Sequence, residues 1–596
     1  MATVVIDPVT RIEGHLRIEA ETSASNVVTR ASSSGTMMRG IEIILKGRDP
    51  RDAWAFTQRI CGVCTVVHSL TSIRAVESAL NWTIPTNARH IRNLMMGSQM
   101  VQDQVTHFYQ LTSMDWIDIV SATKADATAT SNLQKCQSDW PNNSPAYFEG
   151  VKQKLIGFVN TGQLGLFANG YWGHSAYKLP PEMNLMLFAH WLEALDWQRK
   201  VLKVHGIFGG RNPHPNFVVG GVPCTISNAP VLSAQGAKMV AVDPAALNTV
   251  QDCITQMGAF VTKVLRPDVL AMARFYKDWF KVGEGLGNFL SFGDYPLDNN
   301  ANSTNLFVPR GAILGRNLAV VEPVDLANPD EIQEFVANSW YDYSVGKSTG
   351  LHPYEGETAP NYTGPQAAYQ NLDVSQPYSW DKTPRWKGKP MEVGALARVL
   401  MMYAKNTAGA SGKPGARGYV DRALADLKLP LAAMYSTMGR IVAQSIDTQV
   451  IADQLQGWFN DLQTNIKVDL TTHNAEFFDP AAWPDGVLTG VGYTEAPRGA
   501  LGHWVSFEKI ADNGTGSAGG KILNYQCVVP TTWNASPRDH LGQASAYEAA
   551  LVGHTLAVPT QPLELLRTIH SFNPCMACAV HLIDGKGGDA LRVKVC

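Results

Sequence analysis

The sequence lacks the features that would place it in a membrane or on a nucleic acid. It contains no apolar run of about 18 residues, which a transmembrane helix requires. It has no basic tract, and its net charge of −3 gives no attraction to a polyanion. Residues 1–8 have neither the basic nor the apolar region of a signal peptide. Nucleic-acid binding is not expected, and the chain taken alone is predicted to be cytoplasmic unless a partner exports it.

Cysteine is scarce, and this excludes a disulfide-based scaffold. The chain has nine cysteines among 596 residues, whereas disulfide-rich domains are short and densely cross-linked. Hydrophobic residues make up 45% of the chain, which is enough for a large core without covalent cross-links. Five cysteines stand alone and are expected to be small core residues or a tail residue: Cys136, Cys224, Cys253, Cys527 and Cys596.

The other four cysteines form two pairs, Cys61-Gly-Val-Cys64 and Cys575-Met-Ala-Cys578, near opposite ends of the chain. Two thiolates separated by two residues can bind one metal, and two pairs together offer four soft ligands. Zinc ribbons keep their pairs about 15–20 residues apart. Pairs as distant as these predict that the chain ends meet at one buried reaction centre. The residue types alone favour zinc bound by four thiolates.

Hydrophobic periodicity predicts a helix-rich middle between two β-rich ends. Alternating runs predict strands at residues 4–6, 15–20 and 27–32, and again at 486–492, 503–507 and 522–529. Helices are predicted at residues 86–112, 180–207, 244–275, 392–405 and 419–459. Segments 212–230 and 340–389, rich in Pro, Gly, Asn and Tyr, are expected to be functional or interface loops. The predicted fold is α+β, a single large interwoven domain with a central bundle of long helices and termini that meet at the metal site.

His68 follows Cys64 by four residues. If a helix begins there, the two side chains share a face, and the imidazole could donate a hydrogen bond to a metal-bound sulfur. The alternative is a core histidine whose polar atoms are satisfied elsewhere.

The cysteine pairs lie in two longer blocks, Arg59-Ile-Cys61-Gly-Val-Cys64-Thr-Val-Val-His68 and His570-Ser-Phe-Asn573-Pro-Cys575-Met-Ala-Cys578-Ala-Val-His581. Four further blocks are Arg11-Ile-Glu13-Gly-His15, Arg39-Gly-Ile-Glu42, Glu495-Ala-Pro-Arg498-Gly-Ala-Leu-Gly-His503 and Pro530-Thr-Thr-Trp-Asn534. Together these blocks resemble the large, catalytic subunit of the nickel–iron (NiFe) hydrogenases, most of all the membrane-associated uptake type. The resemblance extends from about residue 4 to the C-terminus.

The resemblance implies an enzyme that oxidises molecular hydrogen, reversibly and by heterolysis, to protons and electrons. Cys64 and Cys578 would bridge nickel to an iron that carries carbonyl and cyanide ligands. Those ligands are made by dedicated maturation proteins and are not encoded in this chain. The metal implied is therefore nickel rather than zinc, and its ligands would be Cys61, Cys64, Cys575 and Cys578.

The resemblance also assigns roles around the metals. Glu13 would accept the proton from the sulfur of Cys575 and pass it outward. Arg498 would lie over the metals, with Asp103 as its carboxylate partner. The alternatives are a surface salt bridge for Glu13, a structural ion pair for Arg498 and a solvated helix position for Asp103. Further contacts with the metal cluster would come from His68, Pro497 and Asn573.

A second metal position, usually magnesium in the family, would use mostly oxygen ligands. Glu42 would supply its carboxylate and Cys527 its backbone carbonyl, and His581 matches the remaining protein ligand. His214 lies in a loop that would face the electron-accepting partner, or would only pack there.

Two features depart from the simplest match. The family usually has aspartate at the position of Asn573, and an amide can neither balance the charge of Arg498 nor relay a proton. We expect a more positive local potential there, with proton exit through Glu13 unchanged. The chain also continues past His581. A maturation endopeptidase is expected to remove residues 582–596 after chaperones insert nickel, leaving a catalytic domain of residues 1–581; the alternative is a terminal β-hairpin that stays.

The electrons require a second chain, because no cysteine set remains for an iron–sulfur cluster. An iron–sulfur small subunit is therefore expected, with a membrane cytochrome b as a further partner. The small subunit would carry the export signal, which would place the mature enzyme on the periplasmic face of the cytoplasmic membrane. Three other interpretations are a structural zinc clamp, a quinone-binding relative from respiratory complex I, and a hydrogen sensor. Retention of all four cysteines disfavours the second, and the tail disfavours the third.

Overall fold

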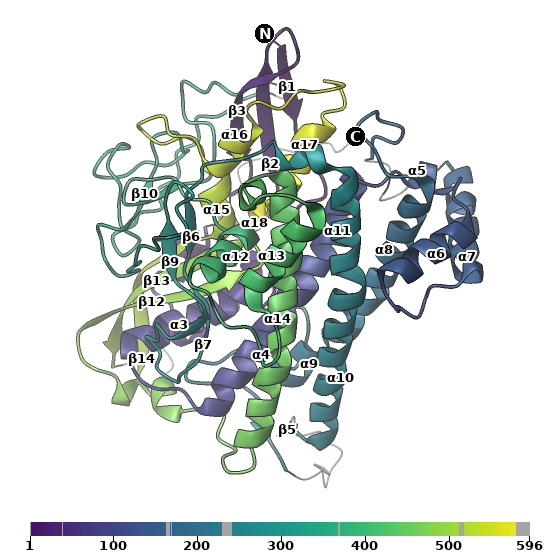
Figure 1. Cartoon of the computed structure of the whole chain (residues 1–596). Coiled ribbons are helices and arrows are strands. Elements are labelled where there is room, and N and C mark those ends of the chain that lie inside the picture. Colours follow the sequence, from purple (N-terminus) through teal and green to yellow (C-terminus); the bar gives the residue numbers. More distant parts are fainter. Residues whose placement is uncertain are drawn as a thin grey trace.

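The N-terminal strands pair with one another and pack on helices from the far end of the chain. The computed structural model describes residues 2–38, 40–162, 167, 170–228, 241–367, 370–511 and 518–579. Strands β1 (Ala2–Ile6), β2 (Leu16–Thr22) and β3 (Val28–Gly35) form an antiparallel sheet in the order β1-β2-β3. Apolar residues of this sheet share a core with α16 (Ala546–Leu551) and α17 (Leu563–Ser571), which confirms that the two ends of the chain meet (Figure 1).

Long helices fill the centre of the molecule (Figure 1). Helix α4 (Thr86–Thr106) packs along α14 (Thr437–Asn465), and Gly97 permits their close approach. A Cβ added at Gly97 would come within 2.8 Å of the Leu455 side chain, so a larger residue would displace the side chains of α14 that pack there. The packing of these long helices confirms the predicted central bundle.

A buried polar network connects the helix bundle to the C-terminal sheet. The carboxylate of Asp447 on α14 accepts hydrogen bonds from Arg398 Nη2 at 2.8 Å and from Gln104 Nε2 at 2.7 Å. Arg398, on α12 (Ala395–Ala404), also donates from Nη1 to the backbone carbonyl of Ala496 at 2.7 Å. All three side chains in this network are fully buried, so losing Arg398 would leave the Asp447 carboxylate buried without a cationic partner.

Several predicted helices are confirmed but interrupted. The predicted helix 419–459 divides because Pro430 cannot continue a helix. Sequence periodicity misses α6 (Ala127–Gln137), whose Thr, Ser and Asn residues are weak helix formers, and α7 (Pro145–Asn160). The observed pieces of the interrupted helices are a π-helical segment His107–Thr112 after α4, α8 (Pro181–Val201), α9 (Lys203–Gly209), α10 (Pro244–Phe260), a second π-helical segment Val261–Leu265, α11 (Arg266–Phe275) and α13 (Gly415–Leu427).

A second antiparallel sheet lies near the C-terminus. Strands β12 (Val487–Ala496), β13 (Gly499–Ile510) and β14 (Gly519–Val528) pair in the order β12-β13-β14, as the alternating pattern predicts. Helix α3 (Val67–Leu80) packs against β12. Because α3 begins shortly after the first cysteine pair, this packing brings that pair to the C-terminal sheet.

Short strands also occur in the middle of the chain, where the sequence does not predict them. Between residues 289 and 386 they form the antiparallel pairs β6-β9, β7-β8 and β10-β11, so β structure is not confined to the two ends. The remaining elements are α1 (Ile41–Leu45), α2 (Ala53–Thr57), α5 (Ile119–Ala122), α15 (Pro530–Ala535), α18 (Met576–Ala579), β4 (Thr225–Ile226), β5 (Ala241–Val242), β6 (Phe289–Ser291), β7 (Asp294–Pro296), β8 (Leu306–Val308), β9 (Gly311–Ile313), β10 (Ile332–Phe335) and β11 (Thr383–Trp386).

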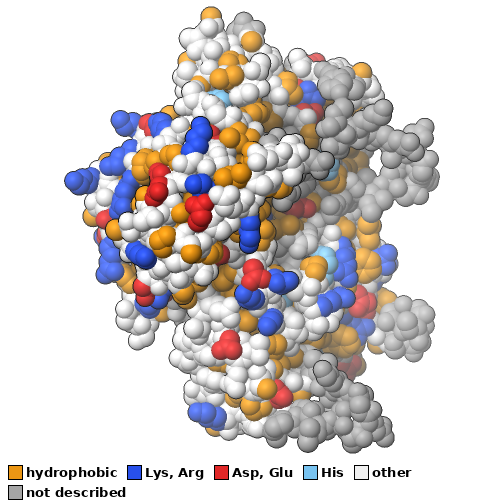
Figure 2. Space-filling view, turned by 90° about the vertical axis from the view of Figure 1, so that its right-hand side faces the viewer, with side chains coloured by type: hydrophobic (Ala, Val, Ile, Leu, Met, Phe, Trp, Pro, Cys, Tyr) orange, Lys and Arg blue, Asp and Glu red, His pale blue; other side chains and the backbone are white. Residues whose placement is uncertain are grey.

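The surface carries charges of both signs. On the face drawn in Figure 2, basic and acidic side chains are dispersed among apolar ones, in keeping with the small net charge of −3. Within the part of the chain that the structure describes, no helix has the length and apolar character needed to cross a bilayer.

Candidate metal centre

The first cysteine pair lies in a short loop between two helical segments. Cys61 has an extended backbone directly after a 3-10 turn, and α3 begins at Val67. The backbone N–H of Cys64 donates to Cys61 Sγ at 3.3 Å. Both side chains are buried, so the loop presents two sulfurs to the interior from one turn of backbone.

Helix α17 leads into the second pair. It is followed by Asn573, whose φ of 56° turns the chain through the left-handed region. The backbone N–H of Cys575 then donates to Thr531 Oγ1 on α15 at 3.0 Å, and Cys578 lies on α18. Helices on either side therefore fix the position of this pair.

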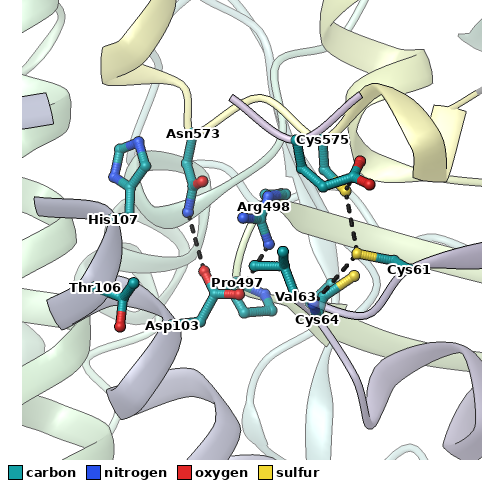
Figure 3. A network of polar contacts seen from close by, with 12 residues as sticks. Cys61, Val63, Cys64, Asp103, Thr106, His107, Pro497, Arg498, Asn573 and Cys575 are labelled. Atoms are coloured by element: carbon teal, nitrogen blue, oxygen red, sulfur yellow. Dashed lines mark hydrogen bonds and ion pairs between the residues drawn. The ribbon is translucent and has the colours of Figure 1, made fainter. Parts of the chain in front are cut away.

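The two pairs meet in one buried cluster of four sulfurs, of which Figure 3 labels Cys61, Cys64 and Cys575. All four Sγ atoms lie within 4.8 Å of one another, and none is in a disulfide. Cys575 Sγ is 3.5 Å from Cys61 Sγ, and Cys64 Sγ is 3.2 Å from Cys578 Sγ. In the described ranges no other set of three or more His, Cys, Asp and Glu side chains brings its ligand atoms this close together. The predicted meeting of both pairs at one buried centre is confirmed.

Burial makes four bare thiolates unfavourable at this position. It raises the pKa of Cys64 to about 11 and raises the pKa values of Cys575 and Cys578 well above the usual thiol value. Burial acts in the same direction on Cys61, but hydrogen bonds from the neighbouring thiols outweigh it and lower the pKa of Cys61. A cation at the centre of the cluster would stabilise all four thiolates together, so the donor set fits a soft, thiophilic metal.

Glu13 lies directly beside the second pair. Its Oε2 accepts hydrogen bonds from the Cys575 thiol at 3.2 Å and from the Ala577 backbone N–H at 2.9 Å. Burial, reinforced by the negative charge of Cys61, raises the pKa of the Glu13 carboxyl, although these two hydrogen bonds act in the opposite direction. The contact suits a carboxyl group that accepts a proton from sulfur.

Arg498 reaches the cluster from the tip of a hairpin (Figure 3). Ala496 pairs with Gly499 where β12 and β13 meet, so Pro497 and Arg498 form the turn between them. Arg498 Nη1 donates to Asp103 Oδ2 at 2.9 Å, which is the partner that the sequence predicts. Its buried Nε and Nη2 have no hydrogen-bond acceptor among the described residues. The guanidinium therefore keeps donors available for a group bound at the sulfurs.

Asn573 joins the same network. Its Nδ2 lies 3.4 Å from Asp103 Oδ1, so one carboxylate contacts both Asn573 and Arg498 (Figure 3). Asn573 and Pro497 also line a small cavity behind these residues. Asp103 can therefore balance the charge of Arg498 without a carboxylate at position 573.

His68 and His214 both lie near the first pair. His68 is buried on the first turn of α3, and its Nδ1 contacts His503 Nε2 at 3.1 Å. The hydrogen bond predicted from this ring to a sulfur stays a prediction. The backbone N–H of His214 donates to Thr65 Oγ1 at 2.5 Å, so the His214 loop packs on the first pair. Its predicted orientation toward a partner chain also stays a prediction.

A second polar cavity lies at the position predicted for magnesium. Glu42 Oε1 accepts a hydrogen bond from the Cys527 backbone N–H at 2.9 Å, and both residues line the cavity. Ala579 lines it as well, two positions before His581. His581 itself lies outside the described residues, as does the tail that follows it.

The sequence does not identify several residues of these two sites. Lys382 Nζ lies 3.6 Å from Glu42 Oε2 and 3.7 Å from Glu334 Oε2 in the second cavity. Burial raises the pKa of Glu334 to about 7, although the nearby charge of Lys382 lowers it. Lys382 belongs to the loop-rich segment 340–389, so composition marked its region but not the residue. Thr531 lies in the block Pro530-Thr-Thr-Trp-Asn534, but the sequence alone does not predict its contact with Cys575.

Comparison with known proteins agrees with this geometry. A family profile described as nickel-dependent hydrogenase matches residues 39–581, and one described as HoxL-like matches residues 3–34. The chain is 51% identical over 602 residues to the uptake hydrogenase large subunit of Rhizobium leguminosarum bv. viciae, covering 99% of this chain and 97% of that protein. It is 49% identical over 601 residues to the hydrogenase-1 large chain of Escherichia coli, with the same coverage.

A solved structure shows the same fold. The Ni-Fe-Se hydrogenase from Desulfovibrio vulgaris Hildenborough in the reduced state superimposes with a TM-score of 0.71 at 30% identity, over 97% of this chain and 100% of that one. The structural similarity therefore extends over nearly the whole of both chains.

Proposed function

Because the chain belongs to the nickel–iron hydrogenases, as a large subunit of the uptake type that oxidises molecular hydrogen, we propose that Cys575 and Glu13 carry the proton step of this reaction. The 3.2 Å contact between Cys575 Sγ and Glu13 Oε2 is the observation that supports the proposal most directly. It joins a sulfur of the metal cluster to a half-buried carboxyl group within hydrogen-bond reach. Exchange of hydrogen with solvent deuterium in a Glu13→Gln variant tests it.

The four cysteines would hold nickel and iron. When bound, a nickel–iron centre with carbonyl and cyanide ligands on the iron supplies the redox chemistry that cleaves hydrogen into protons and electrons. The soft, buried donor set supports these metals, and the available Nε and Nη2 donors of Arg498 support acceptor groups on them. Cys61, Cys64, Cys575 and Cys578, whose sulfurs lie within 4.8 Å of one another, would together hold these metals.

Arg498 and Asp103 would form a fixed polar wall beside the cluster. Asp103 holds the guanidinium through Nη1, which leaves the other donors in one orientation without further side-chain rearrangement. Pro497 restricts the hairpin turn that carries Arg498. His68, on α3, would donate a hydrogen bond to a metal-bound sulfur. These side chains would position groups and hold charge, whereas Glu13 would move the proton.

Asn573→Asp is expected to change the rate of hydrogen oxidation by less than about tenfold, which is about 1.4 kcal/mol of barrier. Asp103 already pairs with Arg498, and the proposed proton acceptor is Glu13, so neither function depends on a carboxylate at position 573. Steady-state oxidation by the assembled enzyme measures the effect, with Asn573→Ala as the variant that removes the Asp103 contact. A much larger loss in Asn573→Asp than in Asn573→Ala would contradict the expectation.

We also propose magnesium in the second cavity, bound by Glu42, the carbonyl of Cys527 and His581. Glu42→Gln is expected to release this metal and to lower stability by about 1–3 kcal/mol, because an amide leaves the Cys527 N–H or Lys382 facing another donor. Metal analysis and thermal unfolding of the complex measure both effects. The exposed Glu355→Gln is the control, and magnesium retained in Glu42→Gln at unchanged stability would reject the site.

A hydrogenase large subunit implies a small-subunit partner. We propose that this partner carries the iron–sulfur clusters that receive the electrons, that a membrane cytochrome b accepts them next, and that the two subunits are exported together to the periplasmic face of the membrane. Residues 582–596 would be removed by an endopeptidase after chaperones insert nickel. Mass spectrometry of the mature subunit tests this step, because it should end at His581.

A further inference from the structure

Glu13 belongs to a short segment, residues 10–14, that lies across the second cysteine pair; we name it the strap. The backbone carbonyl of Glu13 accepts a hydrogen bond from the Met576 N–H at 2.7 Å, and its Oε2 accepts one from the Ala577 N–H. At the end of the strap, a Cβ on Gly14 would lie 2.4 Å from the Ala577 nitrogen, so only glycine permits this approach. The C-terminal half of the strap is thus fixed to the segment that contains Cys575.

The N-terminal half of the strap is held by one buried carboxylate, Asp115. Arg11 Nη2 contacts Asp115 Oδ1 at 2.5 Å, and Arg11 Nη1 donates to the Leu111 carbonyl at 2.7 Å. His570 Nδ1 contacts Asp115 Oδ2 at 2.6 Å. Asp115 is fully buried at the end of the helix that continues from α4, and it therefore joins the strap to α17.

His570 completes the connection. Its Nε2 contacts the backbone carbonyl of Thr10 at 2.9 Å, while its Nδ1 faces the Asp115 carboxylate. Both partners are hydrogen-bond acceptors, so the ring satisfies both only when each nitrogen carries a hydrogen. Thr10 lies three positions before Glu13, and His570 lies five positions before Cys575. The proposed proton donor and acceptor are therefore attached through short segments to the same carboxylate.

We propose that Asp115 is a positioning residue for proton transfer, which acts through Arg11 and His570 to set the distance between Cys575 Sγ and Glu13 Oε2. This proposal rests on the role proposed for Glu13. Proton transfer requires a heavy-atom distance of about 2.6–3.2 Å, and a displacement of about 1 Å can lower a rate by about a hundredfold. The observed 3.2 Å is a close contact for a sulfur donor, and a displacement of about 1 Å would take the pair out of hydrogen-bond reach.

Asp115→Asn separates this role from simple packing because it keeps the shape of the side chain. An amide offers one acceptor oxygen, whereas Arg11 and His570 both present donors. The two contacts use different carboxylate oxygens, so the amide keeps an acceptor for only one of them, and one side of the strap loses its acceptor. Asp268→Asn is a matched control: Asp268 is also fully buried and accepts from His190 Nδ1 at 2.7 Å and the Tyr109 hydroxyl at 2.6 Å, without contacting the strap.

The test uses the mature complex of large and small subunits with its metals. Exchange of hydrogen with solvent deuterium requires the proton to leave the site, whereas conversion of para- to ortho-hydrogen requires only cleavage and re-formation within it. In Asp115→Asn we expect the ratio of exchange to conversion to fall by about tenfold or more, with unchanged nickel and iron content. Asp268→Asn should leave the ratio unchanged. A crystal structure of Asp115→Asn should show Glu13 Oε2 beyond hydrogen-bond distance from Cys575 Sγ.

An unchanged ratio in Asp115→Asn, or an equal fall in exchange and conversion, would overturn the proposal. If Asp115→Asn does not assemble, Arg11→Lys provides the test, because lysine keeps the charge but lacks the planar pair of donors with which Arg11 reaches Asp115 and Leu111. An unchanged ratio in Arg11→Lys would likewise overturn the proposal. Glu13→Gln separates the two proposals. Normal exchange in Glu13→Gln rejects the proton route itself, whereas lost exchange in Glu13→Gln with normal exchange in Asp115→Asn rejects only the role of Asp115.

Discussion

Replacing Cys578 with serine is expected to lower hydrogen oxidation by at least about a thousandfold, or about 4 kcal/mol of barrier. Cys578 Sγ lies 3.2 Å from Cys64 Sγ and 2.7 Å from Cys575 Sγ, in the middle of the cluster. A hydroxyl is a harder and more weakly acidic ligand than a thiol, so it stabilises a soft metal poorly. The loss should therefore extend to the metals themselves, with nickel and iron content falling together with activity.

Activity of the assembled enzyme and elemental analysis of the same sample measure this effect. Cys253→Ser is the matched control, because Cys253 is buried on α10, where its thiol donates to the Lys200 carbonyl, and it does not belong to the four-sulfur cluster. The control should retain metal and turnover. A Cys578→Ser enzyme that kept its nickel and most of its activity would remove Cys578 from the ligand set.

Glu13→Gln is expected to lower hydrogen oxidation by about a hundredfold to ten-thousandfold, the range typical of a lost general base. Glutamine preserves the size of the side chain and can still accept from the Ala577 N–H, so the strap should stay in place. It cannot take a proton from Cys575 at neutral pH. The metals should remain bound, because Glu13 contacts the cluster only through that sulfur.

The rate of hydrogen oxidation and the solvent-exchange rate should fall together in Glu13→Gln while nickel and iron stay constant. Glu21→Gln, on the neighbouring strand β2, is the control for loss of one carboxylate, and it should behave as the unmodified enzyme. Full activity in Glu13→Gln would mean that protons leave the cluster by another route.

The metal cluster is the part of the site that the sequence predicts best. The C-x-x-C spacing alone requires each pair to present two sulfurs together, and two pairs in a chain with few other cysteines predict that both ends meet. The choice of nickel over zinc, and the roles of Glu13 and Arg498, depend on the resemblance to a family. The spacing of the cysteines specifies neither the metal nor these roles, because the sequence position of an isolated glutamate or arginine does not reveal which groups its side chain contacts.

Most of the residues that position the site cannot be identified from the sequence. Asp115, Lys382 and Thr531 become significant only because folding places them beside Arg11, Glu42 and Cys575, which lie far away in the chain. The fold shows a similar limit. Strong helical periodicity predicts the long central helices, whereas the polar helix α6 and the short strands between residues 289 and 386 depend on tertiary packing.

Infrared spectroscopy of the complex purified with its native small subunit tests the central claim most directly. If the four cysteines hold nickel and an iron with carbonyl and cyanide ligands, sharp bands will occur in the metal–carbonyl and cyanide stretching region and will shift under hydrogen. No such bands, together with one zinc per chain and a subunit already processed at His581, would contradict the account and leave a structural zinc clamp in its place.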